Sequence, residues 1–473
     1  MITFLIALAV LIVGYFIYGK FIEGVFQPDA SRATPAITQP DGVDFMPLPN
    51  WKIFTIQFLN IAGIGPIFGA IMGAKFGVAS YLWIVLGTLF AGAVHDYLAG
   101  MISLRNGGES LPESVKRYLG ATTGQVMRFI TVVLLTLVVA VFVASPAGLL
   151  ANLTSGIEVL SLNFWIVAIF VYYVVAALLP IDKIIGRIYP IFAVALLFMA
   201  VGILVMLMVN GVELPELTDG IAHHPNPSLE IFPMMFISIA CGAISGFHAS
   251  QSPMMARCMT NEKQGRPIFY GAMVAEGIVA LIWAAAATYY FGEHGMGESS
   301  PAVIVNEITR SWLGIAGALL ATLGVIFAPI TSGDTALRSA RLIIADILHL
   351  EQKSIKGRMM ITVPLILLTM GILIYSLRDA EGFNIIWRYF AFTNQLLSVF
   401  TLWMVTVYLV KHNRNFFVTL IPALFMTAVT SCYLMVAGEC FALPMIYGYV
   451  VASVLVVVAI GWFVVWYQKN SNK

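Results

Sequence analysis

Ionisable side chains inside apolar segments are the residues of this sequence best able to do chemistry. His95 and Asp96 stand side by side in the apolar run 80–102, and Glu276 lies near the middle of the run 268–291. Burying such groups in lipid must be compensated, which makes them candidates for function, although a lone carboxylate can also simply tie two helices together. Desolvation favours the neutral carboxyl form, so Asp96 or Glu276 could exchange a proton near neutral pH. His95 and His248 could also carry protons, although each alone could equally be a histidine held by hydrogen bonds.

Two glycine-rich interruptions break apolar runs that are otherwise suited to helices. They read NIAGIGP at 60–66 and ACGAISGFHASQSP at 240–253. Glycine and proline unwind a membrane helix, and unpaired backbone at membrane depth is tolerated only beside a cavity or within protein. Close helix packing is the structural alternative. We predict a substrate site from residues in and near these breaks: Asn60, Gly63, Gly65, Gly242, Ser245, Gly246, His248, Thr331, Ser332 and Asn394.

The polar tract at 331–335 ends a further apolar run. Hydroxyl groups of Thr331 and Ser332 suit a substrate carboxylate or a sodium ion, and the N-termini of broken helices favour anions. Asp334 precedes Arg338 by one helical turn, a spacing typical of an ordinary surface ion pair.

The composition indicates how these residues must be housed. Of 473 residues, 60% are hydrophobic and 10% are charged, and the mean hydropathy is +0.91, whereas soluble domains carry about 25% charged residues. The net charge of +1 offers no surface for nucleic acid. The four cysteines have neither metal-site nor disulfide spacing. We predict an all-α polytopic membrane protein with no cofactor and no metal.

Hydropathy predicts about thirteen transmembrane segments. They cover 2–20, 54–73, 80–102, 127–150, 162–180, 188–209, 231–249, 268–291, 313–332, 360–377, 386–410, 417–437 and 446–467. The first basic residue, Lys20, follows segment 2–20 rather than preceding it, which favours a retained helix over a signal peptide.

Lysine and arginine gather in alternate connections between these segments. The connections 151–161 and 210–230 contain none, and Lys75 and Arg378 are isolated exceptions to the alternation. The positive-inside rule then predicts an N-terminus outside and a cytoplasmic C-terminus.

The two interrupted segments are five segments apart and run in opposite directions. Paired broken helices in corresponding positions are typical of transporters built from inverted repeats. We therefore expect a single transporter domain over 1–473, with five-helix repeats at 54–209 and 231–410 and peripheral helices at 2–20 and 417–467.

Four stretches resemble the carbon starvation protein A (CstA) family: NIAGIGPIFGA at 60–70, AVHDYLAG at 93–100, ACGAISGFHASQSP at 240–253 and TSGDTALRSARL at 331–342. The resemblance covers most of the chain. It implies a bacterial inner-membrane transporter of the amino acid–polyamine–cation superfamily with a LeuT-like inverted-repeat fold. Members are described as peptide transporters or proton-coupled pyruvate importers used in starvation. This chain is shorter than the long members and differs at ASQSPMMARC, 249–258, which leaves the solute open.

The expected function is therefore proton symport of a small, pyruvate-like organic acid. Uptake of short peptides or amino acids, with sodium as a candidate coupling ion, is the alternative. The partners are a solute, a proton or sodium ion, and the bilayer; no oligomeric state is indicated.

A membrane enzyme is disfavoured because HExxH and paired aspartates are lacking. A nutrient sensor is disfavoured because the longest cytoplasmic connection, 333–359, is too short for an output domain. A channel is disfavoured because an internal repeat with a midplane break is not a ring of pore helices.

Overall fold

The computed structural model describes residues 1–178, 185–221, 224–226, 229–296, 300–352, 354–378 and 382–470, and these contain helices and no strand. The α-helices are α1 Ile2–Phe26, α2 Pro35–Thr38, α3 Asn50–Ile61, α4 Ile64–Ala74, α5 Val78–Gly87, α6 Ala93–Arg105, α7 Leu111–Leu119, α8 Ala121–Leu153, α9 Leu162–Leu178, α10 Ile185–Val209, α11 Phe236–Ser238, α12 Gly246–Ala256, α13 Gly271–His294, α14 Pro301–Leu348, α15 Ile355–Ser376, α16 Gly382–Lys411, α17 Phe417–Val436 and α18 Met445–Asn470. Short 3-10 or π turns are η1 Thr88–Gly92, η2 Leu217–Asp219, η3 Ile231–Met235, η4 Glu262–Gln264 and η5 Arg266–Tyr270.

Nine helical stretches in the described ranges are long and apolar enough to cross a membrane, and the bent pair α3 and α4 makes a tenth. The all-α multi-pass prediction is therefore confirmed. The exact number of thirteen stays a prediction, because α9 is shorter and the expected segment at 231–249 is divided between η3, α11 and α12.

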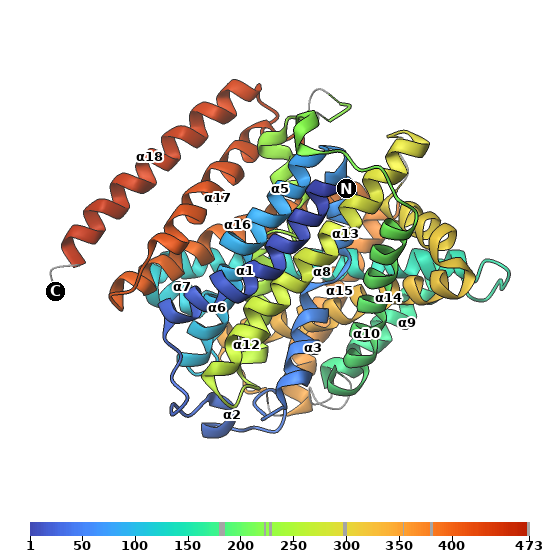
Figure 1. The fold of residues 1–473 in the computed structure, drawn as a ribbon. Helices are drawn as coiled ribbons and strands as arrows, with labels where there is room; N and C mark the ends of the chain where they lie inside the picture. The colour runs from blue at the N-terminus through green and yellow to red at the C-terminus, as the bar shows by residue number, and fades with distance from the viewer. Residues whose placement is uncertain are drawn as a thin grey trace.

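The outermost helices show where lipid must lie. Only 17% of the apolar window of α1 and 11% of that of α18 is buried, and Figure 1 shows α18 at the edge of the molecule beside α17. Apolar side chains exposed on such helices suit acyl chains, which replace water in the bilayer core.

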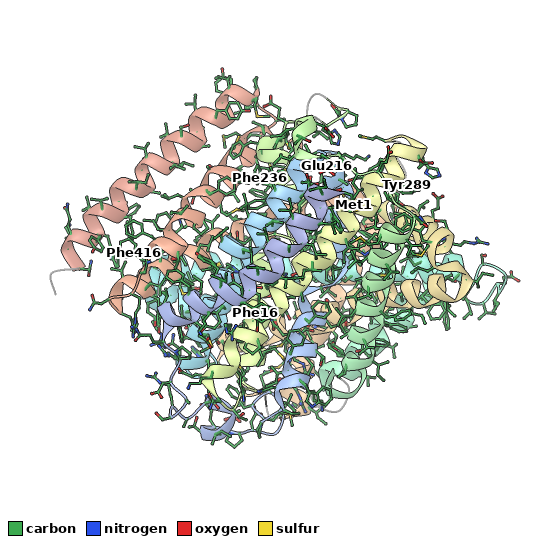
Figure 2. The ribbon with its side chains drawn as sticks, in the orientation of Figure 1. Met1, Phe16, Glu216, Phe236, Tyr289 and Phe416 are labelled. Carbon is green, nitrogen blue, oxygen red and sulfur yellow. The ribbon has the colours of Figure 1, made fainter. Side chains whose placement is uncertain are left out.

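The start of α1 is held by a residue from a distant connection. The Glu216 carboxylate accepts hydrogen bonds from the backbone N–H groups of Ile2 and Thr3, both at 2.7 Å, and from the Met1 amino group. Figure 2 shows Met1 beside Glu216. These bonds, the one from the Met1 amine first, lower the pKa of Glu216 to about 2. The Glu216 carboxyl group is therefore ionised, and able to cap α1, at every pH above about 4, the ordinary pKa of a glutamate.

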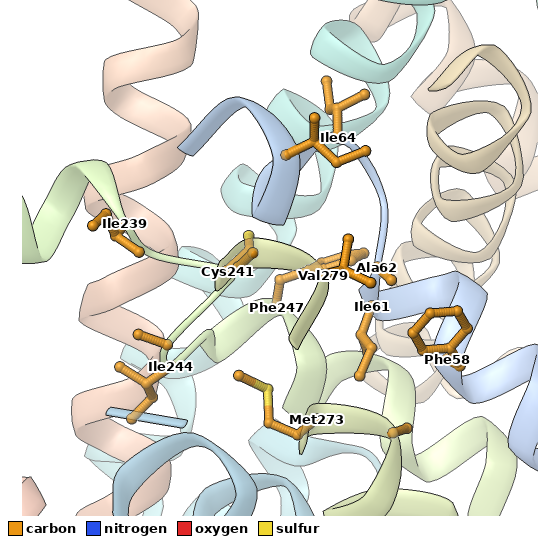
Figure 3. Packing of buried hydrophobic residues seen from close by; sticks show 14 of the residues in the cluster. Phe58, Ile61, Ala62, Ile64, Ile239, Cys241, Ile244, Phe247, Met273 and Val279 are labelled. Carbon is orange, nitrogen blue, oxygen red and sulfur yellow. The ribbon is translucent and has the colours of Figure 1, made fainter. Parts of the chain in front are cut away.

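Both predicted interruptions are breaks between helices. α3 ends at Ile61 and α4 begins at Ile64 with a bend of 45°, and residues 239–245 separate α11 from α12. Figure 3 shows the two breaks close together. A Cβ atom on Gly65 would lie 2.5 Å from Sγ of Cys241, so only glycine permits this approach.

Side chains from neighbouring helices pair with the carbonyl groups that the second break exposes. The indole N–H of Trp83 donates to Ile239 O at 3.1 Å, and the hydroxyl of Thr88 donates to Gly242 O at 3.1 Å. Side chains thus provide the hydrogen bonds that these two carbonyl groups would otherwise lack, as backbone buried in a membrane protein requires.

The helix contacts occur in matching pairs. α4 packs on α13, and the matching pair is α12 with α6. α8 packs on α16, and the matching pair is α14 with α10. α8 and α14 also contact each other. The first break lies beside both of these long helices, because the Cβ position of Gly63 faces Phe142 of α8 and Ser332 of α14.

Two features differ from the sequence prediction. Residues 111–119 form the unpredicted helix α7, with Pro112 in its first turn. Residues 333–348, expected to begin a cytoplasmic connection, continue α14 instead, whose only non-helical residue is Gly314 with φ of 65°. The polar residues of this stretch are not a solvated loop because their side chains are enclosed by other helices.

Candidate functional site

The ionisable residues His95, Asp96, His248 and Glu276 lie next to one another in a buried series of side chains, which we call the buried chain. Nδ1 of His95 lies 2.7 Å from Oδ1 of Asp96, and Nδ1 of His248 lies 2.9 Å from Oδ2. On its other side, Nε2 of His248 lies 3.4 Å from Oε2 of Glu276. All four side chains are fully buried. The buried chain joins α6 to α12 and α13, and Asp96 and His248 are 152 positions apart in the sequence.

The hydrogen bonds define the protonation pattern of this chain. An ionised Asp96 only accepts hydrogen bonds, so each histidine donates its Nδ1–H and leaves Nε2 as an acceptor. A protonated Glu276 can then donate toward Nε2 of His248. Neither Nε2 of His248 nor either Glu276 oxygen has a hydrogen-bond partner within the described part of the chain, so this last link is open.

His248 owes its position to the start of α12. Oδ1 of Asn394 accepts hydrogen bonds from Phe247 N at 2.7 Å and from the hydroxyl of Ser245 at 3.0 Å. The neighbouring Gln395 donates to Ile244 O at 2.9 Å. A Cβ atom on Gly246 would lie 2.4 Å from Asn394 O, so α16 approaches α12 too closely for any other residue. The predicted residues Ser245, Gly246 and Asn394 are therefore brought together, as a helix cap rather than as open ligands.

A second group of oxygens gathers where α14 passes the first break. The hydroxyl of Ser332 donates to Leu59 O at 3.1 Å, and that of Thr335 donates to Oδ1 of Asn60 at 3.2 Å. A Cβ atom on Gly63 would lie 3.1 Å from Oγ of Ser332. The hydroxyl of Thr331, in contrast, bonds only to carbonyl groups of its own helix, at Phe327 and Ala328. Gly242 lies in the other break, against Ala280.

Three buried amides on α3 and α12 keep unpaired polar atoms. Both amide atoms of Gln57, Nδ2 of Asn60 and Oε1 of Gln251 have no hydrogen-bond partner in the described ranges. α3 and α12 pack on each other. Buried polar atoms are normally paired, so these groups are available to water or to a solute. Gln57 was missed because a single glutamine within an apolar run has no distinctive spacing.

Asp334 does not belong to a surface pair, contrary to the sequence prediction. It is fully buried, and its Oδ2 accepts hydrogen bonds from the hydroxyls of Tyr189 at 3.2 Å and Tyr172 at 3.4 Å. Arg338, also buried, pairs instead with Asp44 at 3.0 Å. The turn spacing was read correctly, but tertiary packing supplied both residues with partners from other segments.

A cavity of about 620 Å³ opens beside α4, α8 and the start of α14. We call it the vestibule. Phe68, Ala144, Val325 and Trp387 are among its lining residues. Beyond Trp387 a series of aromatic rings runs to the buried chain: Phe390 at 5.5 Å from Trp387, Phe142 at 6.0 Å, Phe247 at 6.3 Å and His248 at 6.4 Å, each between successive ring centroids.

The opposite end of α14 is closed by the connection between α1 and α3. Asp44 from this connection lies 3.0 Å from Arg338 and 3.4 Å from Arg341. We call these three residues the Asp44 seal. Burial by itself raises the pKa of Asp44, but the two guanidinium groups outweigh it and the pKa is lowered. Beside the seal, Leu48 N donates to Cys258 O at 3.1 Å.

In the described part of the chain, no group of three or more His, Cys, Asp or Glu side chains is arranged to hold a metal ion.

Comparison with solved structures shows the class of protein. The transporter MhsT in complex with L-phenylalanine matches with a TM-score of 0.59 and 13% identity, over 86% of this chain and 99% of that one. A manganese transporter of Eremococcus coleocola matches with a TM-score of 0.54 and 11% identity, over 92% and 99%. At these identities the likeness shows the fold alone, which is the LeuT-like fold of secondary transporters.

The particular family follows from the sequence. The family described as Carbon starvation protein CstA matches residues 1–163, 150–313 and 294–432, so this chain belongs to it. The peptide transporter CstA of Campylobacter jejuni is 27% identical over 90% of this chain and 78% of its own length. The pyruvate/proton symporter BtsT of Escherichia coli is 30% identical over 60% of this chain and 48% of its own length. A membrane protein of Haemophilus influenzae is 43% identical over 60% and 89%. The chain is thus a multi-pass membrane transporter and not an enzyme.

Proposed function

We propose that this transporter imports a small organic acid of the pyruvate class by proton symport across the bacterial inner membrane. The observation that carries the proposal is the buried chain His95–Asp96–His248–Glu276, which joins two carboxyl groups through an imidazole. A similar chain, BtsT, is named a pyruvate/proton symporter. The lysine and arginine pattern supports an outside N-terminus and a cytoplasmic C-terminus.

The proton would bind first at Glu276 and be shared with Nε2 of His248. Proton transfer onto Nε2 releases the Nδ1 proton toward Asp96, so charge passes between the two carboxyl groups through the imidazole of His248. The 3.4 Å gap between His248 and Glu276 must close for this transfer. A small shift of α12 against α13 is enough, which would tie proton transfer to helix movement.

The solute would bind between the two breaks, near the unpaired amides of Gln57, Asn60 and Gln251. The amide N–H groups of Gln57 and Asn60 suit a carboxylate, whereas the unpaired atom of Gln251 is an oxygen that can only accept a hydrogen bond. The fully buried position excludes water once the site closes. The ring of Phe142 lies 3.6 Å from where a Gly63 Cβ would stand, so it forms an apolar wall for a short carbon chain.

Alternating access would arise from rocking between repeats at 54–209 and 231–410. The matching contacts of α4 with α13 and of α12 with α6 support this division. The vestibule is open at one face while the Asp44 seal closes the other. With the proposed orientation, the structure represents an outward-open state.

The test is uptake of radiolabelled pyruvate into proteoliposomes in sodium-free buffer with an inward proton gradient. Accumulation that collapses with a protonophore is the expected result. Absence of accumulation, together with sodium-driven or peptide-competed uptake in the same vesicles, would overturn the pyruvate proposal.

Sodium-coupled uptake of short peptides or amino acids is the second candidate. Four oxygens gather around the first break, on Ser332, Thr335, Leu59 and Asn60, and oxygen ligands of this kind suit a hard cation. The peptide transporter CstA of Campylobacter jejuni matches 90% of this chain, whereas BtsT matches 60%. Under this candidate, Ser332→Ala raises the sodium concentration needed for half-maximal uptake, whereas proton symport is unaffected by sodium.

A further inference from the structure

Three buried arginines lie where the end of α14 meets the start of α15. Arg338 and Arg341 of α14 are 1% and 0% exposed, and Arg358, in the first turn of α15, is 5% exposed. We call these three residues the arginine cluster. The orientation proposed above makes this the cytoplasmic end of α14. Arginine is almost never fully buried unless its charge is paired, so the cluster requires negative charge nearby.

The buried carboxylates of the described chain compensate only part of this charge. Asp44 pairs with Arg338 at 3.0 Å and with Arg341 at 3.4 Å. Asp334, one turn before Arg338, is bonded to tyrosines instead. Arg358 forms no ion pair with the described residues, and its Nε and Nη1 atoms have no hydrogen-bond partner among them. Even with both carboxylates ionised, one of the three positive charges is therefore left over.

The excess positive charge acts on Arg341. Burial first, and then the guanidinium groups of Arg338 and Arg358, lower its pKa to about 10, although Asp44 acts in the opposite direction. Gln352 accepts a hydrogen bond from Arg341 at 2.8 Å but brings no charge, and Nε of Arg341 has no partner in the described ranges. Arg341 and Arg358 are thus like charges that repel each other inside the protein.

Reaching water is the usual alternative for a long basic side chain at the edge of a membrane. Only 5% of Arg358 is exposed, and it lies on the same face of α15 as the buried residues Ile361, Thr362 and Leu365. Its charge is therefore directed into the protein, where a bound anion would relieve the repulsion.

The available donors suit an anion that presents two oxygens side by side. A guanidinium group offers parallel N–H bonds that match a carboxylate or a phosphate. Asp44 already shows this chemistry, because its two carboxylate oxygens bind two different arginines of the cluster. At the cytoplasmic end, such an anion is either the solute as it leaves or phosphate from the cytosol.

We propose that Arg341 and Arg358 form a binding site for a small oxyanion, a carboxylate or a phosphate, beside the Asp44 seal. Occupancy by the departing solute rests on the proposed function, whereas the binding of an oxyanion does not. The site is separate from the buried amides between the two breaks, so the two can be tested apart.

The first test measures the melting temperature of the purified, detergent-solubilised chain in phosphate, pyruvate or chloride at equal ionic strength. Phosphate is expected to raise the melting temperature of wild type well beyond chloride, since a ligand of the folded state stabilises it. Pyruvate is measured in a Gln57→Ala background, because wild type also offers the proposed site between the breaks. Arg358→Gln should lose the gain, and in chloride it should melt no lower than wild type because it removes an uncompensated buried charge.

Two further variants sharpen this test. Arg358→Lys keeps the charge but loses the paired N–H groups, so it should lose most of the gain, and it replaces the glutamine variant if that chain does not fold. Lys356→Gln removes an exposed cation from the same turn and should keep the gain. Equal melting temperatures in chloride and in both oxyanions would overturn the proposal. A gain that is retained in Arg358→Gln, at a lower melting temperature throughout, would assign Arg358 to helix packing alone.

The second test distinguishes the two sources of the anion by pyruvate exchange from each face of the membrane. In everted vesicles, which expose the cytoplasmic face, Arg358→Gln is expected to raise the pyruvate concentration for half-maximal exchange roughly tenfold, the loss of one charge-assisted hydrogen bond. In right-side-out vesicles the value should equal that of wild type. Unchanged values on both faces, with the phosphate gain lost, would identify phosphate as the ligand. If wild type exchanges no pyruvate but Arg358 still governs the phosphate gain, the proposed function fails and the oxyanion site stands.

Discussion

At the scale of single residues, His248 changes the interpretation of the site. The sequence placed it with the substrate-binding residues because it stands in a broken helix. Its ring instead lies between Asp96, at 2.9 Å, and Glu276, at 3.4 Å. An imidazole can pass a proton between its two nitrogens, so a residue between two carboxyl groups is suited to couple them.

Replacing Glu276 by glutamine tests this coupling directly. The amide keeps the size of the side chain but cannot take up a proton. We expect Glu276→Gln to abolish accumulation driven by a proton gradient, yet to retain exchange of solute across the membrane. Radiolabel uptake and counterflow in the same proteoliposomes measure both. Glu293→Gln, an exposed residue of the same helix, is the matched control. Gradient-driven uptake that survives in Glu276→Gln would exclude Glu276 as the coupling residue.

Asn394 provides the second prediction at this scale. Its side-chain oxygen accepts two hydrogen bonds at the start of α12, and no mobile group can replace it in a buried position. Asn394→Ala is expected to destabilise the protein by about 1–3 kcal/mol, the cost of leaving a buried donor unpaired. Thermal unfolding in detergent would detect this as a lower melting temperature. Asn210→Ala, in the exposed turn after α10, should leave the melting temperature unchanged.

At the scale of elements, the connection between α1 and α3 carries Asp44 and so forms the Asp44 seal with α14. Asp44 compensates two buried guanidinium groups on α14, so its loss would leave Arg338 and Arg341 to repel each other. Cys258 lies next to the seal and is fully buried. Burial, together with the negative charge of Asp44, raises the pKa of its thiol to about 12, which makes Cys258 unreactive while the seal is closed.

We expect Asp44→Asn to increase the rate of maleimide labelling at Cys258 by about tenfold or more, because loss of a buried pair shifts conformational equilibria strongly. The background is a variant with the other three cysteines replaced. Asp29→Asn is the control. Asp29 lies in the same connection, and its carboxylate accepts hydrogen bonds from the backbone N–H and the hydroxyl of Ser31. Labelling that stays at the wild-type rate in Asp44→Asn would mean that the seal does not depend on this ion pair.

The seal should also be indifferent to physiological changes of pH. The pKa of Asp44 is lowered from its ordinary value of 3.8, so its ion pairs are fully formed above about pH 4 and are lost only as pH falls through the lowered pKa. The ratio of labelling rates between Asp44→Asn and wild type should therefore stay constant from pH 8 to pH 6. A ratio that falls toward one at pH 6 would show that the seal itself titrates.

At the scale of the whole molecule, the vestibule and the seal predict how the protein moves. Met72 on α4 and Val303 on α14 face the vestibule from different helices and are 37% and 46% exposed. Spin labels at these positions, in a variant without native cysteines, are expected to approach each other by several ångströms when solute and a proton are bound. Electron–electron resonance distances in liposomes measure this closure. Unchanged distances alongside active transport would exclude rocking at this face.

The lipid-facing periphery is a further property of the whole molecule. α17 and α18 pack on each other, and α18 leaves most of its apolar surface uncovered (Figure 1). The matching contacts that surround the breaks involve helices from α3 to α16. We therefore propose that the transport machinery lies in the central helices and that the C-terminal pair adds breadth in the bilayer.

The sequence alone determined the all-α membrane class, the two breaks and the ionisable residues of the site, because hydropathy, glycine and proline act through local chain properties. It also identified the CstA family through four motifs. Only the tertiary structure could decide which residues meet. His248 joins Asp96 and Glu276 in the buried chain, and Asp334 is buried with tyrosines. Arg338 pairs with Asp44, from a connection 294 positions away. Such partners are chosen by how helices pack across long sequence separations, and no local pattern carries that information.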